Sequence, residues 1–288
     1  MTYRELKKFA AETLKACHSD SYEYDVRCLC EHFLNVDRVT FDAMKDRSPD
    51  PEQEKDFIEA VRKRSEGCPL QYILGQWTFM DNEFYVGRGV LIPRDDTEVC
   101  VRECTEYLAR KEKPRIIDLC SGSGAIAVTL AKMFPAAEVY ALEMMPKAYQ
   151  YLVKNIRHNK TENVKAVKGD IFRCYRNFEN NYFDLIISNP PYVETDVIPT
   201  LQREVRFEPA AALNGGTDGL KFYRVIADKW LPTLKNNGAI SLEIGETQAD
   251  AVSKMLENRG IHGIRIVKDI QNLDRVVFGT KMRRKNIF

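Results

Sequence analysis

The sequence lacks any apolar run of the roughly 20 residues that a helix needs to cross a lipid bilayer. Its first residues, Met1 to Leu14, alternate charged and apolar types and have no apolar core of a secretory signal peptide. With 288 residues, 44% of them hydrophobic, the chain can build one large domain and a smaller one. We therefore expect a soluble, cytoplasmic protein that does not bind membranes.

Paired Cys-x-x-Cys clusters are also lacking, although the chain has eight cysteines. Many zinc sites use such pairs, so the sequence predicts no metal site. Scattered thiols in a cytoplasmic protein stay reduced, which excludes a disulfide framework.

Neither sign of charge is in large excess, since the net charge is +1. Residues 1–75 hold twelve Lys or Arg against fifteen Asp or Glu. A mildly acidic front part is a poor surface for a phosphate backbone. We expect no stable binding of DNA or RNA.

Residues 1–75 show the spacing of short helices. Apolar residues recur every three or four positions from Leu6 to Leu14 and again from Val26 to Phe33. Pro49 and Pro51 are expected to open a further helix, and Gly67 with Pro69 to end it. We predict a small helical bundle that recognises the substrate.

Residues 76–92 differ from this bundle, because aromatic and β-branched residues alternate there with Gly. This composition predicts a β-hairpin linker.

From residue 93 to residue 288 the pattern becomes strand–helix alternation, which predicts a mainly parallel, doubly wound sheet. Five short apolar runs are expected to be its strands: residues 115–119, 139–143, 164–169, 183–188 and 239–244. Two more runs, 264–268 and 275–280, follow each other without a helix, so they should pair antiparallel at the sheet edge. The expected fold is a Rossmann-like α/β domain of seven strands.

The first predicted strand ends in small residues that open a helix. Asp118 supplies a carboxylate, and the turn after it contains Cys120, Ser121, Gly122, Ser123 and Gly124. Backbone N–H groups of such a turn can approach a ligand. The third Gly of the dinucleotide fingerprint and the Lys of a P-loop are missing. A ligand with an ammonium and a carboxylate, such as the methionine part of S-adenosylmethionine, fits better than a nucleotide phosphate.

The next two strand ends offer groups for an adenosyl ligand. Glu143 lies about twenty residues past the turn, where a carboxylate can accept hydrogen bonds from both ribose hydroxyls. Asp170 ends the third strand, where an adenine amino group needs an acceptor, and Ile171 can pack on the ring. Three successive strand ends thus predict one site for S-adenosylmethionine.

The fourth strand runs into Asn189-Pro190-Pro191-Tyr192, the most informative motif of the chain. The prolines have no N–H, so the loop presents carbonyl acceptors. The Asn189 side chain has one acceptor and two donors, and Tyr192 offers a flat wall. Together these four residues can hold a planar carboxamide with its nitrogen facing a methyl donor.

Such a clamp matters because the lone pair of an amide nitrogen is delocalised, which makes it a poor nucleophile. Accepting its N–H with the Pro190 carbonyl, in line with a sulfonium methyl, favours methyl transfer. We predict Asn189, Pro190 and Tyr192 as catalytic residues.

These motifs resemble the amino-methyltransferases with an Asn-Pro-Pro-aromatic motif, and within them the release factor glutamine methyltransferases of the PrmC/HemK family. The resemblance covers nearly the whole chain and also includes residues 69–75, 90–94, 208–209, 215–220, 242–245 and 274–277. It implies methylation of the glutamine N(5) in the Gly-Gly-Gln motif of class 1 peptide chain release factors, with S-adenosylhomocysteine as the other product. It also implies that Asn189 contacts the cofactor.

The chain departs from the family pattern at a few positions. Glu143 stands where Asp is usual, and Cys120 replaces a Gly found in many members. Asn272 and Leu273 replace a Gly-Arg pair, which puts only the details of that loop in doubt.

Two other functions compete with this one. An adenine-N6 DNA or RNA methyltransferase uses the same clamp, but it needs a flipped base and a basic groove. The acidic front part and the small net charge disfavour it. A non-catalytic binding protein on the same scaffold is disfavoured by the intact clamp and strand ends.

Overall fold

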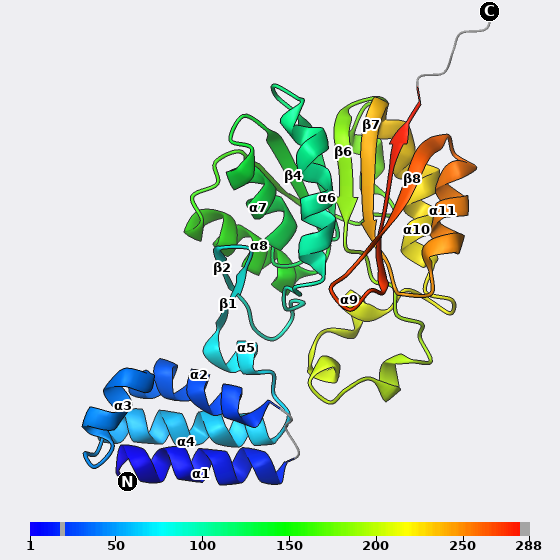
Figure 1. The fold of residues 1–288 in the computed structure, drawn as a ribbon. Coiled ribbons are helices and arrows are strands. Elements are labelled where there is room, and N and C mark those ends of the chain that lie inside the picture. The colour runs from blue at the N-terminus through cyan, green and yellow to red at the C-terminus, as the bar shows by residue number, and fades with distance from the viewer. Residues whose placement is uncertain (18–20, 283–288) are drawn as a thin grey trace, which may run out of the picture. The chain divides into compact units, whose positions relative to one another are not determined.

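The computed structural model describes residues 1–17 and 21–282 (Figure 1). These described residues form two compact units, one of residues up to 76 together with 202–207, and one of residues 77–201 together with 208–282. None of the helices in these described ranges is long and apolar enough to span a membrane.

The first unit is helical. Its helices are α1 (Tyr3–Ala16), α2 (Tyr22–Leu34), α3 (Arg38–Met44), α4 (Pro51–Ser65) and α5 (Leu70–Leu74). Thr2, Asp37 and Asp50 cap α1, α3 and α4, because each side chain accepts a hydrogen bond from the first turn. The sequence indicated α1, α2 and α4 but not α3 and α5, which are too short to show a helical period.

The segment Gln202–Phe207, which includes a 3₁₀ turn at Val205–Phe207, packs with these helices although it is distant in sequence. Arg64 accounts for much of this packing. It is only 8% exposed, and its guanidinium lies 2.8 Å from Asp25 Oδ2 and 3.0 Å from Glu204 Oε1. Nothing in the local pattern of residues 202–207 predicts this contact.

The second unit contains a seven-stranded sheet in the order β5-β4-β3-β6-β7-β9-β8. Its strands are β3 (Arg115–Leu119), β4 (Glu138–Glu143), β5 (Val164–Lys168), β6 (Phe183–Ser188), β7 (Leu234–Glu243), β8 (Ile261–Lys268) and β9 (Asp274–Lys281). Strands β3 to β7 are parallel, whereas β9 pairs antiparallel with both β7 and β8. The predicted Rossmann-like sheet of seven strands, with an antiparallel pair at its edge, is confirmed.

Successive residues of the central strands face opposite sides of the sheet, so two hydrophobic cores form. Ile116 and Leu185 belong to one core, and their neighbours Ile117 and Ile186 belong to the other. The first core is covered by α6 (Thr97–Ala109), α7 (Ala125–Met133) and α8 (Pro146–His158), and the second by α10 (Lys221–Val225) and α11 (Ala249–Glu257) (Figure 1).

The helical segment between β6 and β7 is not one continuous α-helix. After α10 the chain continues as a π-helix (Ile226–Trp230) and a 3₁₀ turn (Leu231–Thr233). Pro232 lies in that turn and cannot donate to a continuing helix, so β7 begins at Leu234, earlier than predicted. The remaining short elements are Cys174–Asn177, Ile198–Thr200 and α9 (Ala210–Leu213).

A hairpin of β1 (Gln76–Phe79) and β2 (Asn82–Tyr85) precedes this sheet in the chain. Phe79 and Phe84 are almost completely buried in the core beneath α6 and α7. The hairpin therefore packs as part of the second unit.

The sheet topology brings the carboxyl ends of its parallel strands to one edge. Leu119 is paired with both Leu142 and Ser188, and Ser188 is paired with Leu242. Strand order reverses between β3 and β6, which is where open α/β sheets bind ligands. The residues after these strands therefore surround one crevice.

Candidate active site

A cleft of about 970 Å³, counting the part open to solvent, lies at this edge. Small-molecule pockets typically have about 300–1,000 Å³, so it can hold a nucleoside-sized ligand. Of the predicted site residues it gathers Cys120, Ser121, Gly122, Ser123, Glu143, Asp170, Ile171, Asn189 and Pro191. The other four, Asp118, Gly124, Pro190 and Tyr192, lie next to this lining but not on it.

The turn after β3 requires unusual backbone angles. Gly122 and Gly124 have φ of 57° and 86°, and Cys120 has φ of 61°. A Cβ on Gly124 would lie 2.6 Å from Leu152 Cδ1, so only Gly fits where α7 begins against α8. Cys120 occupies the left-handed region without this freedom, which is a local strain at the cleft.

Asp118 is fully buried below this turn and does not face the cleft. Ser121 Oγ donates to its Oδ2 at 2.7 Å, while no described residue donates to Oδ1. Burial raises the pKa of Asp118 to about 7, although hydrogen bonds from Ser121 and Ala127 lower it. In this structure the carboxylate supports the turn from beneath.

Glu143 ends β4 and lines the cleft with only 7% of its surface exposed. Its Oε2 accepts from the Gly122 N–H at 2.8 Å and its Oε1 from the Met145 N–H at 2.6 Å. Burial raises the pKa of this carboxylate, and the backbone hydrogen bonds oppose the shift. Each oxygen keeps a second lone pair, so the side chain can still accept from a ligand.

Asp170 and Ile171 line the cleft directly after β5. Asp170 Oδ1 accepts from the Phe172 N–H at 2.9 Å, which fixes the turn. The Ile171 carbonyl accepts from the buried Trp230 indole at 2.9 Å. The Ile171 side chain is thereby held as an apolar surface next to a carboxylate.

The Asn189-Pro190-Pro191-Tyr192 motif follows β6, as the sequence indicated. Asn189 Nδ2 donates to Thr97 Oγ1 at 3.0 Å, and no residue in the described ranges donates to Asn189 Oδ1. One amide hydrogen is therefore used within the protein, whereas the carbonyl oxygen is available to a ligand. The sequence did not indicate this contact, because Thr97 is 92 residues away.

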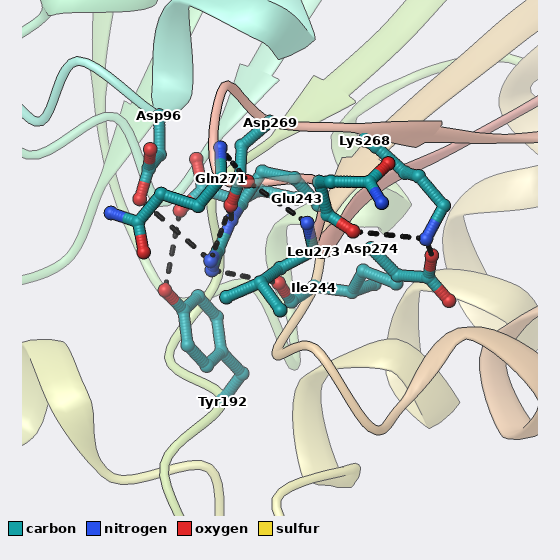
Figure 2. Close-up of polar contacts among 11 residues, drawn as sticks. Asp96, Tyr192, Glu243, Ile244, Lys268, Asp269, Gln271, Leu273 and Asp274 are labelled. Atoms are coloured by element: carbon teal, nitrogen blue, oxygen red, sulfur yellow. Dashed lines mark hydrogen bonds and ion pairs between the residues drawn. The ribbon is translucent and has the colours of Figure 1, made fainter.

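Tyr192 is held by its side chain and by its backbone. Its hydroxyl donates to Glu243 Oε1 at 3.3 Å (Figure 2), and Gln248 Nε2 donates to its carbonyl at 3.0 Å. Gly245 and Gly219 leave room for this packing, since a Cβ on Gly219 would lie 2.4 Å from the Tyr192 carbonyl. These contacts fix the end of the motif.

Two supporting residues were not assigned a role from the sequence. Glu208 Oε2 accepts from the Ile92 N–H at 2.9 Å and pairs with Arg94, so it orders one wall of the cleft. Asn155 on α8 is fully buried and donates to the Ser123 carbonyl at 2.9 Å. Of these two residues, only Glu208 belonged to a recognisable sequence motif, the Glu-Pro pair at residues 208–209.

The arrangement combines acceptors for a polar ligand with an amide-bearing loop. In the part of the chain that the structure describes, no group of three metal-ligating side chains is found. The chemistry of the lining fits S-adenosylmethionine: a turn of backbone N–H groups, carboxylates at two strand ends and an apolar wall.

Comparison with known proteins also indicates a methyltransferase. Residues 5–75 match the PrmC N-terminal domain, and residues 100–216 match the methyltransferase small domain. The release factor glutamine methyltransferase of Thermodesulfovibrio yellowstonii is 39% identical over 257 residues, which cover 88% of this chain and 90% of that protein. The one of Clostridium acetobutylicum is 35% identical, over 94% of this chain and 96% of its own.

These matches confirm the predicted enzyme class, a methyltransferase with S-adenosylmethionine as its cofactor. The chain belongs to the family of release factor glutamine methyltransferases.

Proposed function

We propose that this chain methylates the side-chain amide nitrogen N(5) of the glutamine in the Gly-Gly-Gln motif of class 1 peptide chain release factors. The observation that carries the proposal is the anchored Asn189 at the end of β6, whose Oδ1 is available at the cleft. The relatives are release factor glutamine methyltransferases, which supports a release factor as the substrate. Such a substrate places the reaction in the cytoplasm.

The residues around the cleft divide into two groups in this proposal. The backbone of Cys120, Ser121, Gly122, Ser123 and Gly124 holds the methionine part of the cofactor, with Asp118 fixing the turn. Glu143 accepts from the ribose, and Asp170 with Ile171 binds the adenine. S-adenosylmethionine, when bound, supplies an electrophilic methyl group on its sulfonium.

The second group acts on the glutamine. Asn189 Oδ1 and the Pro190 carbonyl accept hydrogen bonds from the substrate amide, which orients its nitrogen. Pro191 and Tyr192 form the wall against which the planar amide rests. Acceptors placed on the N–H groups also stabilise the positive charge that develops on nitrogen during transfer.

The alternative substrate, an adenine N6 in DNA or RNA, would use the same clamp. It requires a basic surface that holds a phosphate backbone, whereas this chain has a net charge of only +1. The proposal therefore excludes stable binding of nucleic acid.

One assay tests the choice of substrate. Tritiated S-adenosylmethionine is offered with a class 1 release factor and, in separate reactions, with DNA and RNA. We expect label in the release factor alone, at the Gly-Gly-Gln glutamine by mass spectrometry. Label in a nucleic acid and none in the release factor would replace the proposal with the adenine-N6 alternative.

Asn189→Ala is expected to lower kcat/KM for the release factor by roughly 10²–10³ while changing the cofactor affinity much less. The reason is that the variant removes an oriented acceptor at the reacting group. Asn189→Asp should also be clearly impaired, because Asp cannot donate to Thr97 and adds a charge. Near-normal methylation by the Asp variant would show that the Asn189 donors are not needed.

A further inference from the structure

Glu243 is a buried carboxylate beside the motif that holds the substrate amide. It ends β7, is 1% exposed, and accepts from the Tyr192 hydroxyl at 3.3 Å through Oε1. Its Oε2 is buried without a hydrogen-bond partner among the described residues. Burial raises the pKa of Glu243 to about 7. A fold rarely keeps such a group without a use, since an incompletely paired buried carboxylate is costly.

Thr97 binds Asn189 and also influences the same carboxylate. The Thr97 hydroxyl is 5% exposed and accepts from Asn189 Nδ2 at 3.0 Å. A hydroxyl that accepts this bond still has its own proton to donate. Its contact with Glu243 lowers the pKa of that carboxyl, although no hydrogen bond within 3.5 Å joins the two side chains.

We propose that Glu243 is a positioning residue of the amide clamp, which orients Asn189 through Thr97 and Tyr192 directly. The inference rests on the proposed function, because it assumes that Asn189 and Tyr192 hold a glutamine amide.

The direction of the hydrogen bonds is what Glu243 determines. Thr97 Oγ1 accepts from Asn189 Nδ2, so its own proton is left for another acceptor, and an ionised Glu243 carboxylate can only accept. Asn189 then presents Oδ1, the acceptor that the N–H of the substrate requires. An amide side chain at position 243 could instead donate to the Thr97 oxygen. The Thr97 hydroxyl could then donate to Asn189, and the Asn189 amide could rotate so that Oδ1 no longer faces the substrate.

Arg275 on β9 favours the charged form of this buried carboxylate. Its guanidinium lies 2.9 Å from Asp269 Oδ2 and 3.7 Å from Asp96 Oδ2. Both aspartates are labelled in Figure 2 together with Glu243. The positive charge of Arg275 lowers the pKa of Glu243, while the negative charge of Asp96 raises it. The start of α6, the end of β7 and the strand β9 thus meet under the clamp.

The test compares Glu243→Gln, Thr97→Val, Thr97→Ser and the double variant Glu243→Gln/Thr97→Val in the full chain. We expect Glu243→Gln and Thr97→Val each to lower kcat on a release factor by about 10–100-fold, the usual effect of losing a residue that orients a site. The dissociation constant for S-adenosylmethionine, from calorimetry, should stay within about twofold of the wild type. Thr97→Ser keeps the hydroxyl and should restore most of the activity that Thr97→Val loses.

The double variant separates positioning from general damage. Because both substitutions break one chain of contacts, it should be no slower than the slower single variant. Asp184→Asn is the matched control, since Asp184 is a buried carboxylate at the opposite end of β6 that pairs with Lys235. It should leave kcat at the wild-type value.

Three outcomes would overturn the inference. They are wild-type kcat in Thr97→Val, additive losses in the double variant, or an equal loss of kcat in Asp184→Asn. Wild-type enzyme that leaves release factors unmethylated would instead contradict the proposed function, and the inference with it.

Discussion

At the scale of single residues, two buried carboxylates beside the cleft oppose the stability of the fold. Burial raises the pKa of Asp118 and of Glu243 to about 7, although Ser121 in one case and Thr97 and Arg275 in the other pull the pKa down. The charged form of each group is therefore less favourable in the folded chain than in the unfolded one. Their retention is consistent with a role at the site rather than in stability.

The free energy of unfolding should fall as pH rises from about 4.5 to about 7 and then level off. An unfolded Glu loses its proton near its ordinary pKa, whereas folded Glu243 keeps it until about 7, so the folded state binds more protons in this window. A shift of this size corresponds to a few kcal/mol at most, by about 1.4 kcal/mol per unit. Glu243→Gln should make the fall in stability between pH 5 and pH 8 smaller, measured by urea unfolding, while Asp118 accounts for the part that remains. A variant that loses as much stability as the wild type between these two pH values would contradict the raised pKa.

Glu143 provides a second prediction at this scale. Glu143→Ala should weaken the binding of S-adenosylmethionine by at least tenfold, because it removes charge-assisted hydrogen bonds worth about 1.5–3 kcal/mol each. The Gly122 N–H would also lose its acceptor, which loosens the turn. Calorimetric titration measures the effect, and Glu138→Ala on the same strand is the control. Equal affinities of Glu143→Ala and the wild type would remove Glu143 from the cofactor site.

At the scale of elements, the cleft depends on how α8 holds its neighbours. Asn155 accepts from the Tyr85 N–H at 2.7 Å and donates to the carbonyls of Tyr85 at 3.0 Å and Ser123 at 2.9 Å. One side chain thereby joins β2 to the turn that opens α7. An asparagine in the middle of an amphipathic helix gave no such indication in the sequence.

Asn155→Ala should destabilise the chain by about 3–5 kcal/mol, because three backbone groups in a buried place lose their partner at about 1–3 kcal/mol each. It should also weaken cofactor binding, since Ser123 lines the cleft. Urea unfolding and calorimetry measure the two effects. Asn159→Ala is the matched control, one turn later, where a half-buried side chain donates to the Glu83 carbonyl. If both variants cost the same, the buried position of Asn155 is not what matters.

At the scale of the whole molecule, none of the residues that the structure describes in the helical first unit lines the cleft. Recognition of the folded release factor by this unit, the role predicted from the sequence, is consistent with that division. The unit also includes Gln202–Phe207, which follows the Asn-Pro-Pro-Tyr motif in the chain.

A chain that begins near Gln76 is therefore expected to bind S-adenosylmethionine normally but to methylate an intact release factor poorly. A short peptide with the Gly-Gly-Gln sequence should be methylated similarly by both proteins, since it has no surface for the missing unit. Light scattering must show that the shortened chain is monodisperse, because the deletion uncovers residues 202–207. Full activity on the intact release factor would contradict a recognition role for residues 1–75.

The sequence by itself determined the fold class and the order of the strands along the chain. Apolar periodicity, the small-residue turn at 120–124 and the Asn-Pro-Pro-Tyr motif are local patterns, and local patterns are readable without coordinates. Glu143, Asp170 and Asn189 could be placed at one edge because the parallel strands of such a sheet end there.

Only the tertiary structure decided which side chains support these groups. Thr97 beside Asn189, Glu243 beside Tyr192 and Arg64 beside Glu204 are pairs separated by 51 to 140 residues. It also placed Asp118 beneath the turn, although the sequence pattern had assigned this carboxylate to the ligand. The physical reason is that the position of a residue at a strand end follows from the backbone. The direction in which its side chain is buried, by contrast, depends on packing partners that the chain brings in from elsewhere.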